Sequence, residues 1–265
     1  MKKALSAQEL YLKSVKRTNG KVRFWRIFLC ILFIAAWEFC AQRELINSFI
    51  FSSPSKLARC LKDLLLNQNL AGHIGITLFE TLASFALVIL ISLILAVLLW
   101  NSRTLSRILE PYMVMLNSLP KSALAPLLIV WLGANYKTII LTGISVAVFG
   151  SIMNLYTGFI ETDREKIKLI YTLGGTKRDA LCKVILPANI PNLFSIMKVN
   201  IGLCLVGVII GEFIAARQGL GYLIIYGSQV FKMDWVILSI LILCIIAMGL
   251  YLMLDRLERI FKNFS

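Results

Sequence analysis

Apolar runs of about 20 residues, nearly free of charge, recur along this chain and limit what it can fold into. A helix needs roughly 20 residues to cross about 30 Å of hydrocarbon. Apolar residues make up 58% of the 265 residues, against about 45–50% in soluble domains, so lipid is the expected solvent. We predict an all-α polytopic bundle with six membrane spans, at residues 24–41, 76–100, 112–132, 138–160, 193–216 and 235–254.

The six runs do not suit a straight helix equally well. The third contains Pro120 and Pro126, so it is the least regular, although a buried membrane helix tolerates proline. The fourth carries no charge, and its Gly143 and Ala147 are spaced as a small-x-x-x-small pair. Such pairs let two membrane helices approach closely, and we therefore interpret this one as a packing feature.

Lys and Arg are distributed unequally between the two sides that six spans define. With the amino terminus inside, the inner segments hold 19 of these residues and the outer segments hold 7. The positive-inside rule then places both termini in the cytoplasm. We expect the membrane to be a bacterial plasma (inner) membrane. We predict a basic cytoplasmic segment at residues 1–23 and a multi-pass domain at 24–265. The first run lacks a small-residue cleavage site, so we interpret it as a retained span.

Two connections between spans are long enough to contain structure of their own. Residues 42–75 include Ser53-Pro54, a helix start, followed by leucines and basic residues at helical spacing, which predicts an interfacial helix. Residues 161–191 show charged residues, then Gly174-Gly175, then a second helical stretch ending at Pro187. We predict two short cytoplasmic helices here, hinged at glycine, between spans 4 and 5.

The sequence offers no catalytic, cofactor-binding or metal-ligating constellation. His73 is the single histidine, and a lone histidine is more often a packing residue than a ligand. The phosphate-binding G-x-x-x-x-G-K-S/T loop is absent, so ATP hydrolysis of that kind is not expected in this chain. The net charge of +14 fits contact with anionic membrane lipid better than nucleic acid, because no base-reading module accompanies it.

Four charged residues lie within or at the ends of the predicted spans: Lys121, Lys198, Glu80 and Glu212. Each costs about 2.5–3.5 kcal/mol at bilayer depth, so each should face protein or water. One hypothesis is that Lys121, with Asn117 and Ser118, lines a solute pathway and attracts an anion, and we add Glu212 to this set. The alternative is that Lys121 pairs with a carboxylate or extends to the membrane surface.

Three motifs in order resemble those of permeases of binding-protein-dependent ABC importers, specifically the nitrate/sulfonate/taurine branch. The loop residues Gly174, Val184, Leu186 and Pro187 resemble the family's EAA loop, although the Glu-Ala-Ala triplet is replaced by Lys168, Leu169 and Ile170. The other two motifs are Leu119-Pro120-Lys121-Ser122-Ala123-Leu124-Ala125-Pro126-Leu127, and Gly211-Glu212-Phe213 with Gly219-Leu220-Gly221-Tyr222.

The resemblance implies a permease subunit, not an enzyme, that forms the pathway for a small solute. Candidate solutes are organic or inorganic anions, such as a sulfonate or nitrate, or a vitamin precursor. It further implies a homodimer of permeases, two ATPase subunits that carry ATP and Mg²⁺, and an external solute-binding protein. The implied contacts with the ATPase subunit are Ile167, Ile170, Leu173, Gly174, Leu186 and Pro187.

A secondary transporter that does not use ATP is the alternative function. Such a protein should show inverted repeats and broken midplane helices with intramembrane carboxylates, and no convincing internal repeat is present. Purification from mild detergent would separate the two functions, since only an ABC permease should retain an ATPase subunit.

Overall fold

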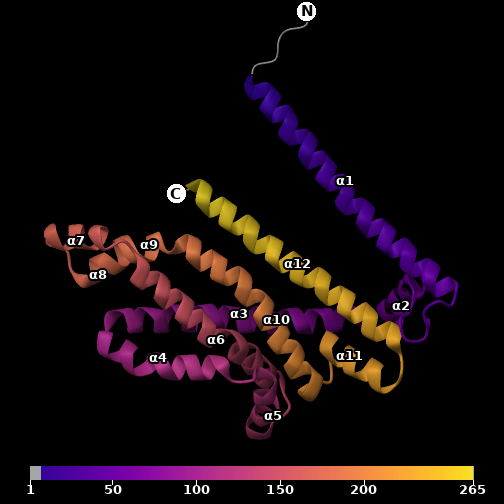
Figure 1. Cartoon of the computed structure of the whole chain (residues 1–265). Helices are drawn as coiled ribbons and strands as arrows, with labels where there is room; N and C mark the ends of the chain where they lie inside the picture. Colours follow the sequence, from indigo (N-terminus) through magenta and orange to yellow (C-terminus); the bar gives the residue numbers. More distant parts are fainter. Residues whose placement is uncertain (1–6, 265) are drawn as a thin grey trace, which may run out of the picture. The chain divides into compact units, whose positions relative to one another are not determined.

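The structure is a computed structural model, and it describes residues 7–264, nearly all of them helical. The sequence prediction of an all-α protein is confirmed for this part of the chain. The helices, labelled as in Figure 1, are α1 (Ala7–Gln42), α2 (Pro54–Asn67), α3 (Leu70–Asn101), α4 (Arg103–Ser118), α5 (Lys121–Leu132), α6 (Tyr136–Glu161), α7 (Arg164–Thr172), α8 (Lys177–Ala180), a π-helical turn (Leu181–Ile185), α9 (Leu186–Ala188), α10 (Ile190–Ala215), α11 (Leu220–Gln229) and α12 (Met233–Phe264).

The chain divides into two units, residues 1–63 and residues 64–265. In the first unit, Glu38 on α1 accepts hydrogen bonds from the backbone N–H of Ser55 at 3.0 Å and from its hydroxyl at 2.8 Å. These bonds fix the start of α2, which begins at Pro54 as predicted from the sequence. The apolar side chains of α1 from Phe24 to Phe33 are exposed, as expected for a helix that faces lipid.

Five of the described helices are long and apolar enough to cross a membrane, and a bent helix pair would make a sixth. The five are α3, α6, α10, α12 and the segment Gly20–Gln42 of α1. Each contains one of the predicted spans, except that the span predicted at 193–216 extends one residue beyond the end of α10. The predicted boundary at residue 23 falls inside α1, which is continuous from Ala7.

The third predicted span, residues 112–132, is irregular near Pro120, as the prolines in its sequence indicate. It is divided between α4 and α5, whose axes differ by 95°. Leu119 has ψ 140° and Pro120 precedes the first residue of α5. Since proline disfavours the α conformation in the residue before it, helix α4 ends at Ser118. Figure 1 shows α4 running back beside α3 and α5 turning away from it.

Helices α3, α6 and α10 pack against one another and form the core of the second unit. Their closest approach is at Gly207 of α10 and Gly143 of α6, where a Cβ on Gly207 would lie 2.8 Å from the Gly143 Cα. A Cβ on Gly143 would lie 2.5 Å from the Ser84 hydroxyl of α3. The packing interpretation of Gly143 is therefore confirmed, because no larger side chain fits between the three helices.

Lys198 faces protein, as the cost of an isolated charge in lipid requires. Its Nζ lies 2.6 Å from Oδ1 of Asp255 and 2.5 Å from Oε2 of Glu258, both on α12. The two carboxylates also pair with Arg259 and Lys262 of their own helix. This network joins α10 to α12 near the carboxyl-terminal end of the chain.

Candidate functional site

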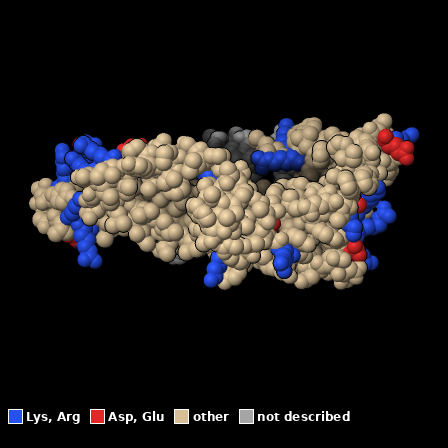
Figure 2. Space-filling model, turned by 90° about the horizontal axis from the view of Figure 1, so that it is seen from below, with Lys and Arg blue, Asp and Glu red and all other residues tan. Residues whose placement is uncertain are grey.

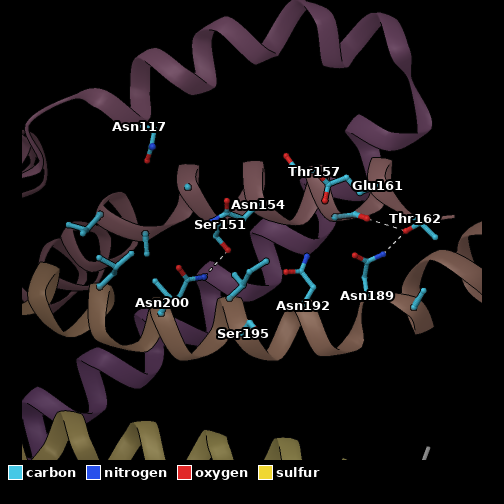
Figure 3. A pocket seen from close by; sticks show the side chains of 18 of the residues that line it. Asn117, Ser151, Asn154, Thr157, Glu161, Thr162, Asn189, Asn192, Ser195 and Asn200 are labelled. Atoms are coloured by element: carbon cyan, nitrogen blue, oxygen red, sulfur yellow. Dashed lines mark hydrogen bonds between the residues drawn. The ribbon is translucent and has the colours of Figure 1, made fainter. Parts of the chain in front are cut away.

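A polar groove lies between α6 and α10, in helices that are otherwise apolar. Its volume is about 650 Å³, and Asn117 at the end of α4 contributes to its wall. Figure 3 shows Ser151 and Asn200, and likewise Thr162 and Asn189, pointing toward one another across the space between the two helices, with Asn117 coming from α4. Its uncharged polar residues are Asn117, Ser151, Asn154, Thr157, Thr162, Asn189, Asn192, Ser195 and Asn200.

Two hydrogen bonds join the walls of this groove. The Asn200 amide donates to the Ser151 hydroxyl at 2.8 Å, and the Asn189 amide donates to the Thr162 hydroxyl at 2.8 Å. All four residues are buried, so these bonds satisfy groups that would otherwise be unpaired. They fix the separation of α6 and α10 along the groove.

Other amides of the groove have hydrogen-bonding capacity to spare. Within the part of the chain that the structure describes, the side chains of Asn154 and Asn192 make no hydrogen bond to protein. Each amide offers two N–H donors and a carbonyl acceptor. The groove can therefore bind a solute that both donates and accepts hydrogen bonds.

The charged residues of the groove are confined to one end. They are Glu161, Asp163 and Lys166, which follow one another at the junction of α6 and α7. Asp163 also caps α7, since its Oδ1 accepts from the Glu165 N–H at 2.9 Å. The remaining lining is neutral, so an anion deep in the groove would meet no cationic side chain.

Of the four predicted pathway residues, the structure brings only Asn117 to the groove. Ser118 donates to the Val114 carbonyl at 2.9 Å. The Lys121 ammonium donates to the Leu116 carbonyl at 3.2 Å and to the Asn117 carbonyl. These carbonyls lie in the last turn of α4. Because a cation at the carboxyl-terminal end of a helix interacts favourably with the helix dipole, Lys121 stabilises the end of that helix.

Glu212, the fourth predicted pathway residue, lies in a buried contact between α3, α10 and α11. Its Oε1 accepts from the Thr77 hydroxyl at 2.7 Å, and its Oε2 accepts from the Gly221 N–H at 2.5 Å. The Thr77 hydroxyl in turn accepts from the Leu220 N–H at 2.9 Å. Glu212 is 1% exposed. It lies outside the groove and connects the three helices through hydrogen bonds.

The glycines near Glu212 leave room for its carboxylate. A Cβ on Gly219 would lie 2.4 Å from the Glu212 Cδ, and one on Gly221 would lie 2.7 Å from Oε2. His73 completes the contact, because its Nδ1 accepts from the Gly219 N–H at 2.9 Å and its ring stacks on Tyr222. The interpretation of His73 as a packing residue is confirmed, and the described residues contain no group of three potential metal ligands.

The loop between α6 and α10 has the predicted form of two short helical stretches separated at glycine. Gly174 has φ +81°, a conformation that favours glycine, and the Gly175 N–H donates to the Ile170 carbonyl at 2.8 Å. Thr176 and Asp179 then form a capping box at the start of α8. Hydrogen bonds from Lys183 and Thr176 hold the pKa of the Asp179 carboxyl well below its usual range.

The predicted ATPase contacts do not share one exposed face. Ile167 packs into the core beside Phe159, and Leu186 is partly buried in the same cluster. Leu173 is 75% exposed. Of the other apolar side chains that α7 exposes, Leu169 lies one helical turn before Leu173, whereas Tyr171 lies on another side of the helix.

Ile170 is half-buried, whereas Gly174 and Pro187 are exposed. Of the predicted contacts Ile167, Ile170 and Leu173, only Leu173 lies on the exposed apolar side of α7, which it shares with Leu169. The physical reason is that the side of α7 carrying Ile167 packs against this chain's own core.

Sequence reasoning missed most of the groove, although a signal was present. Ser151, Asn154 and Thr157 recur every three residues on α6. Asn189, Asn192 and Ser195 do the same at the start of α10. Polar residues at helical spacing in an apolar helix indicate a face that is not exposed to lipid.

The family model described as "Binding-protein-dependent transport system inner membrane component" matches residues 88–263. The chain belongs to this family. The match includes α6, α10 and the loop between them, so groove and loop both lie in the region that defines the family. Membership supports the prediction of an ABC importer permease over that of a secondary transporter.

Relatives of this permease are named for different solutes. It is 28% identical to the formylaminopyrimidine transport permease of Halalkalibacterium halodurans, covering 78% of this chain and 82% of that one. It is 27% identical to the taurine transport system permease of Escherichia coli K12, covering 85% and 84%. A solved methionine ABC transporter in inward-facing conformations has the same fold, with TM-score 0.65, 20% identity, and coverage of 72% and 94%.

Proposed function

We propose that the groove between α6 and α10 is the solute pathway of an ATP-driven importer, and that the α6–α10 loop receives the movement of separate ATPase subunits. The observation that supports the pathway is the line of amide and hydroxyl groups through apolar helices. Such groups are costly in lipid and are retained where a polar solute or water passes. The groove is open along one side, which suits completion by a second copy of this permease.

The loop supports the second half of the proposal. Leu169 and Leu173, one helical turn apart, form an exposed apolar surface at the end of α7, and a short helix with such a surface can dock in a groove of a partner. Glycine at 174 allows the chain to reverse directly after it. ATP and Mg²⁺ would be held by the partner, and an external binding protein would deliver the solute.

The groove favours an uncharged solute over an anion. Away from the charged end, the polar groups of its lining are amides and hydroxyls only, and an anion held there would lose hydration without gaining a cationic partner. Among the solutes named for the two relatives, a formylaminopyrimidine matches these groups better than taurine, which carries a sulfonate. We therefore propose a neutral, hydrogen-bonding heterocycle as the solute class.

The Leu173→Asp variant tests the coupling role. A carboxylate at the centre of a docked apolar surface must be desolvated without a partner, so we expect at least about a tenfold loss of ATP-driven uptake. Co-purification of the ATPase subunit should fall in parallel, while the amount of permease in the membrane stays unchanged.

Thr172→Asp is the matched control for this variant. It adds the same charge one position away on an exposed side chain whose hydroxyl donates only to the Lys168 carbonyl. Full uptake by Leu173→Asp, or an equal loss in both variants, would count against docking through Leu173.

The solute class can be tested without the external binding protein. The permease–ATPase complex in nanodiscs is expected to bind radiolabelled formylaminopyrimidine at least about tenfold more tightly than taurine. Taurine is a zwitterion, and its sulfonate would lose hydration in the groove without gaining a cationic partner. Ser195→Lys, which adds a cation to the groove wall, should raise the relative binding of taurine. Preference of the unmodified complex for taurine would refute a neutral solute while leaving the importer function intact.

A further inference from the structure

A second cavity, the basic pocket, lies apart from the groove, at the corner where α3 ends and α4 begins. Its volume is about 840 Å³, and α7 and the start of α8 close its other side. Five cationic side chains line it, and its lining contains no carboxylate. They are Arg103, Arg107, Arg164, Lys168 and Lys177.

The cations of the basic pocket are not neutralised by the protein. Among the residues that the structure describes, none of the five has a carboxylate within ion-pair distance, whereas Lys183, Lys198, Arg259 and Lys262 all do. Lys177 instead donates to the Asn101 carbonyl at 2.5 Å and lies 5.3 Å from the Trp100 ring centre. Unpaired like charges around one hollow repel one another, and a bound anion would relieve that repulsion.

Arginine is suited to one class of anion in particular. Its planar guanidinium binds phosphate oxygens through two parallel hydrogen bonds. Three arginines on two different helices, Arg103 and Arg107 of α4 and Arg164 of α7, border the same hollow. A phosphate group held between them would join α7 to the α3–α4 corner.

The remaining lining of the basic pocket is apolar and aromatic. Trp100, Tyr156 and Tyr171 contribute rings, and Leu99 and Phe159 contribute apolar surface at the ends of α3 and α6. Aromatic and basic side chains at the end of a membrane span are typical of headgroup depth. Figure 2 shows basic side chains gathered at the end of the molecule where α7 and the α3–α4 corner lie in Figure 1.

We propose that the basic pocket binds the phosphate of an anionic ligand, with a phospholipid headgroup as the favoured source and a free phosphate as the other. Basic pockets between membrane helices on the cytoplasmic side bind acidic lipid headgroups in this manner. The proposal does not depend on the identity of the solute or on the ATPase partner. It assigns Arg103, Arg107 and Arg164 to binding, and gives the bound phosphate a role in holding α7.

The experiment measures lipid retained by the full-length chain in detergent. Wild type is titrated with phosphatidylglycerol, phosphatidylcholine or inorganic phosphate, and bound molecules are counted by native mass spectrometry alongside the melting temperature. We expect phosphatidylglycerol to bind and stabilise. The triple variant Arg103→Gln/Arg107→Gln/Arg164→Gln should bind it at least about tenfold more weakly, since each basic residue contributes about 1 kcal/mol near an anionic surface.

Two further variants keep the result interpretable. Arg103→Lys/Arg107→Lys/Arg164→Lys retains the charge and should bind with intermediate affinity, which also shows that these positions tolerate substitution. Lys137→Gln/Arg217→Gln/Lys232→Gln removes three charges outside the basic pocket and should bind phosphatidylglycerol as wild type does.

Each measurement either identifies the source of the bound phosphate or shows that the basic pocket is not a phosphate site. Stabilisation by inorganic phosphate equal to that by phosphatidylglycerol would support the phosphate site and assign it to a free phosphate. Equal binding of phosphatidylcholine, or undiminished phosphatidylglycerol binding by the glutamine variant, would overturn the proposal. Loss of ATPase-subunit capture by that variant with unchanged lipid binding would also overturn it, and would assign these arginines to the partner.

Discussion

Replacing Gly219 by alanine is expected to lower the melting temperature of the purified protein by about 6–12 °C, from a loss of about 3 kcal/mol. Gly219 has φ +120° and ψ 166°, a region of backbone conformation that is essentially restricted to glycine. The added methyl group would also lie 2.4 Å from the Glu212 carboxylate. That carboxylate cannot move aside without breaking its bonds to Thr77 and Gly221. Thermal unfolding in detergent, followed by tryptophan fluorescence, measures the effect.

Gly202→Ala is the matched control. Gly202 lies on α10, and a Cβ there would have no heavy atom within 4 Å. Alanine is favoured over glycine in a helix by about 1 kcal/mol, so this variant should melt at or slightly above the wild-type temperature. If Gly219→Ala had the same melting temperature as wild type, the contact around Glu212 would be looser than the structure shows.

If the proposed solute class is correct, the double variant Asn154→Leu/Asn192→Leu is expected to reduce uptake of a neutral heterocycle, with formylaminopyrimidine as the probe, by about 100-fold. Leucine has the same branched arrangement of side-chain heavy atoms as asparagine, although it is larger, and it cannot form hydrogen bonds. Each lost hydrogen bond to solute removes about 1–1.5 kcal/mol, which corresponds to about tenfold per residue. Initial uptake rates in cells that also produce the ATPase subunit and the binding protein provide the measurement.

Val199→Leu is the control inside the groove. Val199 is an exposed apolar residue of the lining, so this change alters size without removing a polar group, and uptake should stay within about twofold of wild type. Basal ATPase activity of the assembled complex should be unchanged in both variants. Undiminished uptake by the double variant would exclude these amides from the pathway.

Features that depend on local sequence could be predicted without the structure. The helix at each apolar run follows from the cost of burying unpaired backbone groups in lipid, which does not depend on neighbours. Pro120 was visible as an irregularity, and the hinge at Gly174 with its flanking helices was predicted from Gly174-Gly175 and Pro187. The 95° bend between α4 and α5 was not, because its size depends on packing around the break.

Features that depend on which helix faces meet could not be predicted in this way. For Lys121 we considered a pathway cation, a partner for a carboxylate, or a side chain extending to the membrane surface, whereas in the structure its ammonium donates to a carbonyl at the end of α4. Glu212 was grouped with Lys121, yet Thr77, 135 positions away in the sequence, binds its carboxylate. In both residues the charge was evident from sequence, whereas its partner was not.

The sequence by itself determined that this protein is a helical membrane permease with a glycine-hinged loop, since length, hydropathy and motif order are properties of contiguous segments. Only the tertiary structure decided which polar residues share a groove, which side of α7 is exposed, and which cations surround the basic pocket. Asn154 and Asn192 acquire a common role only when α6 and α10 pack together. The physical reason is that helix rotation and crossing depend on complementary packing of side chains from distant segments, which no single segment encodes.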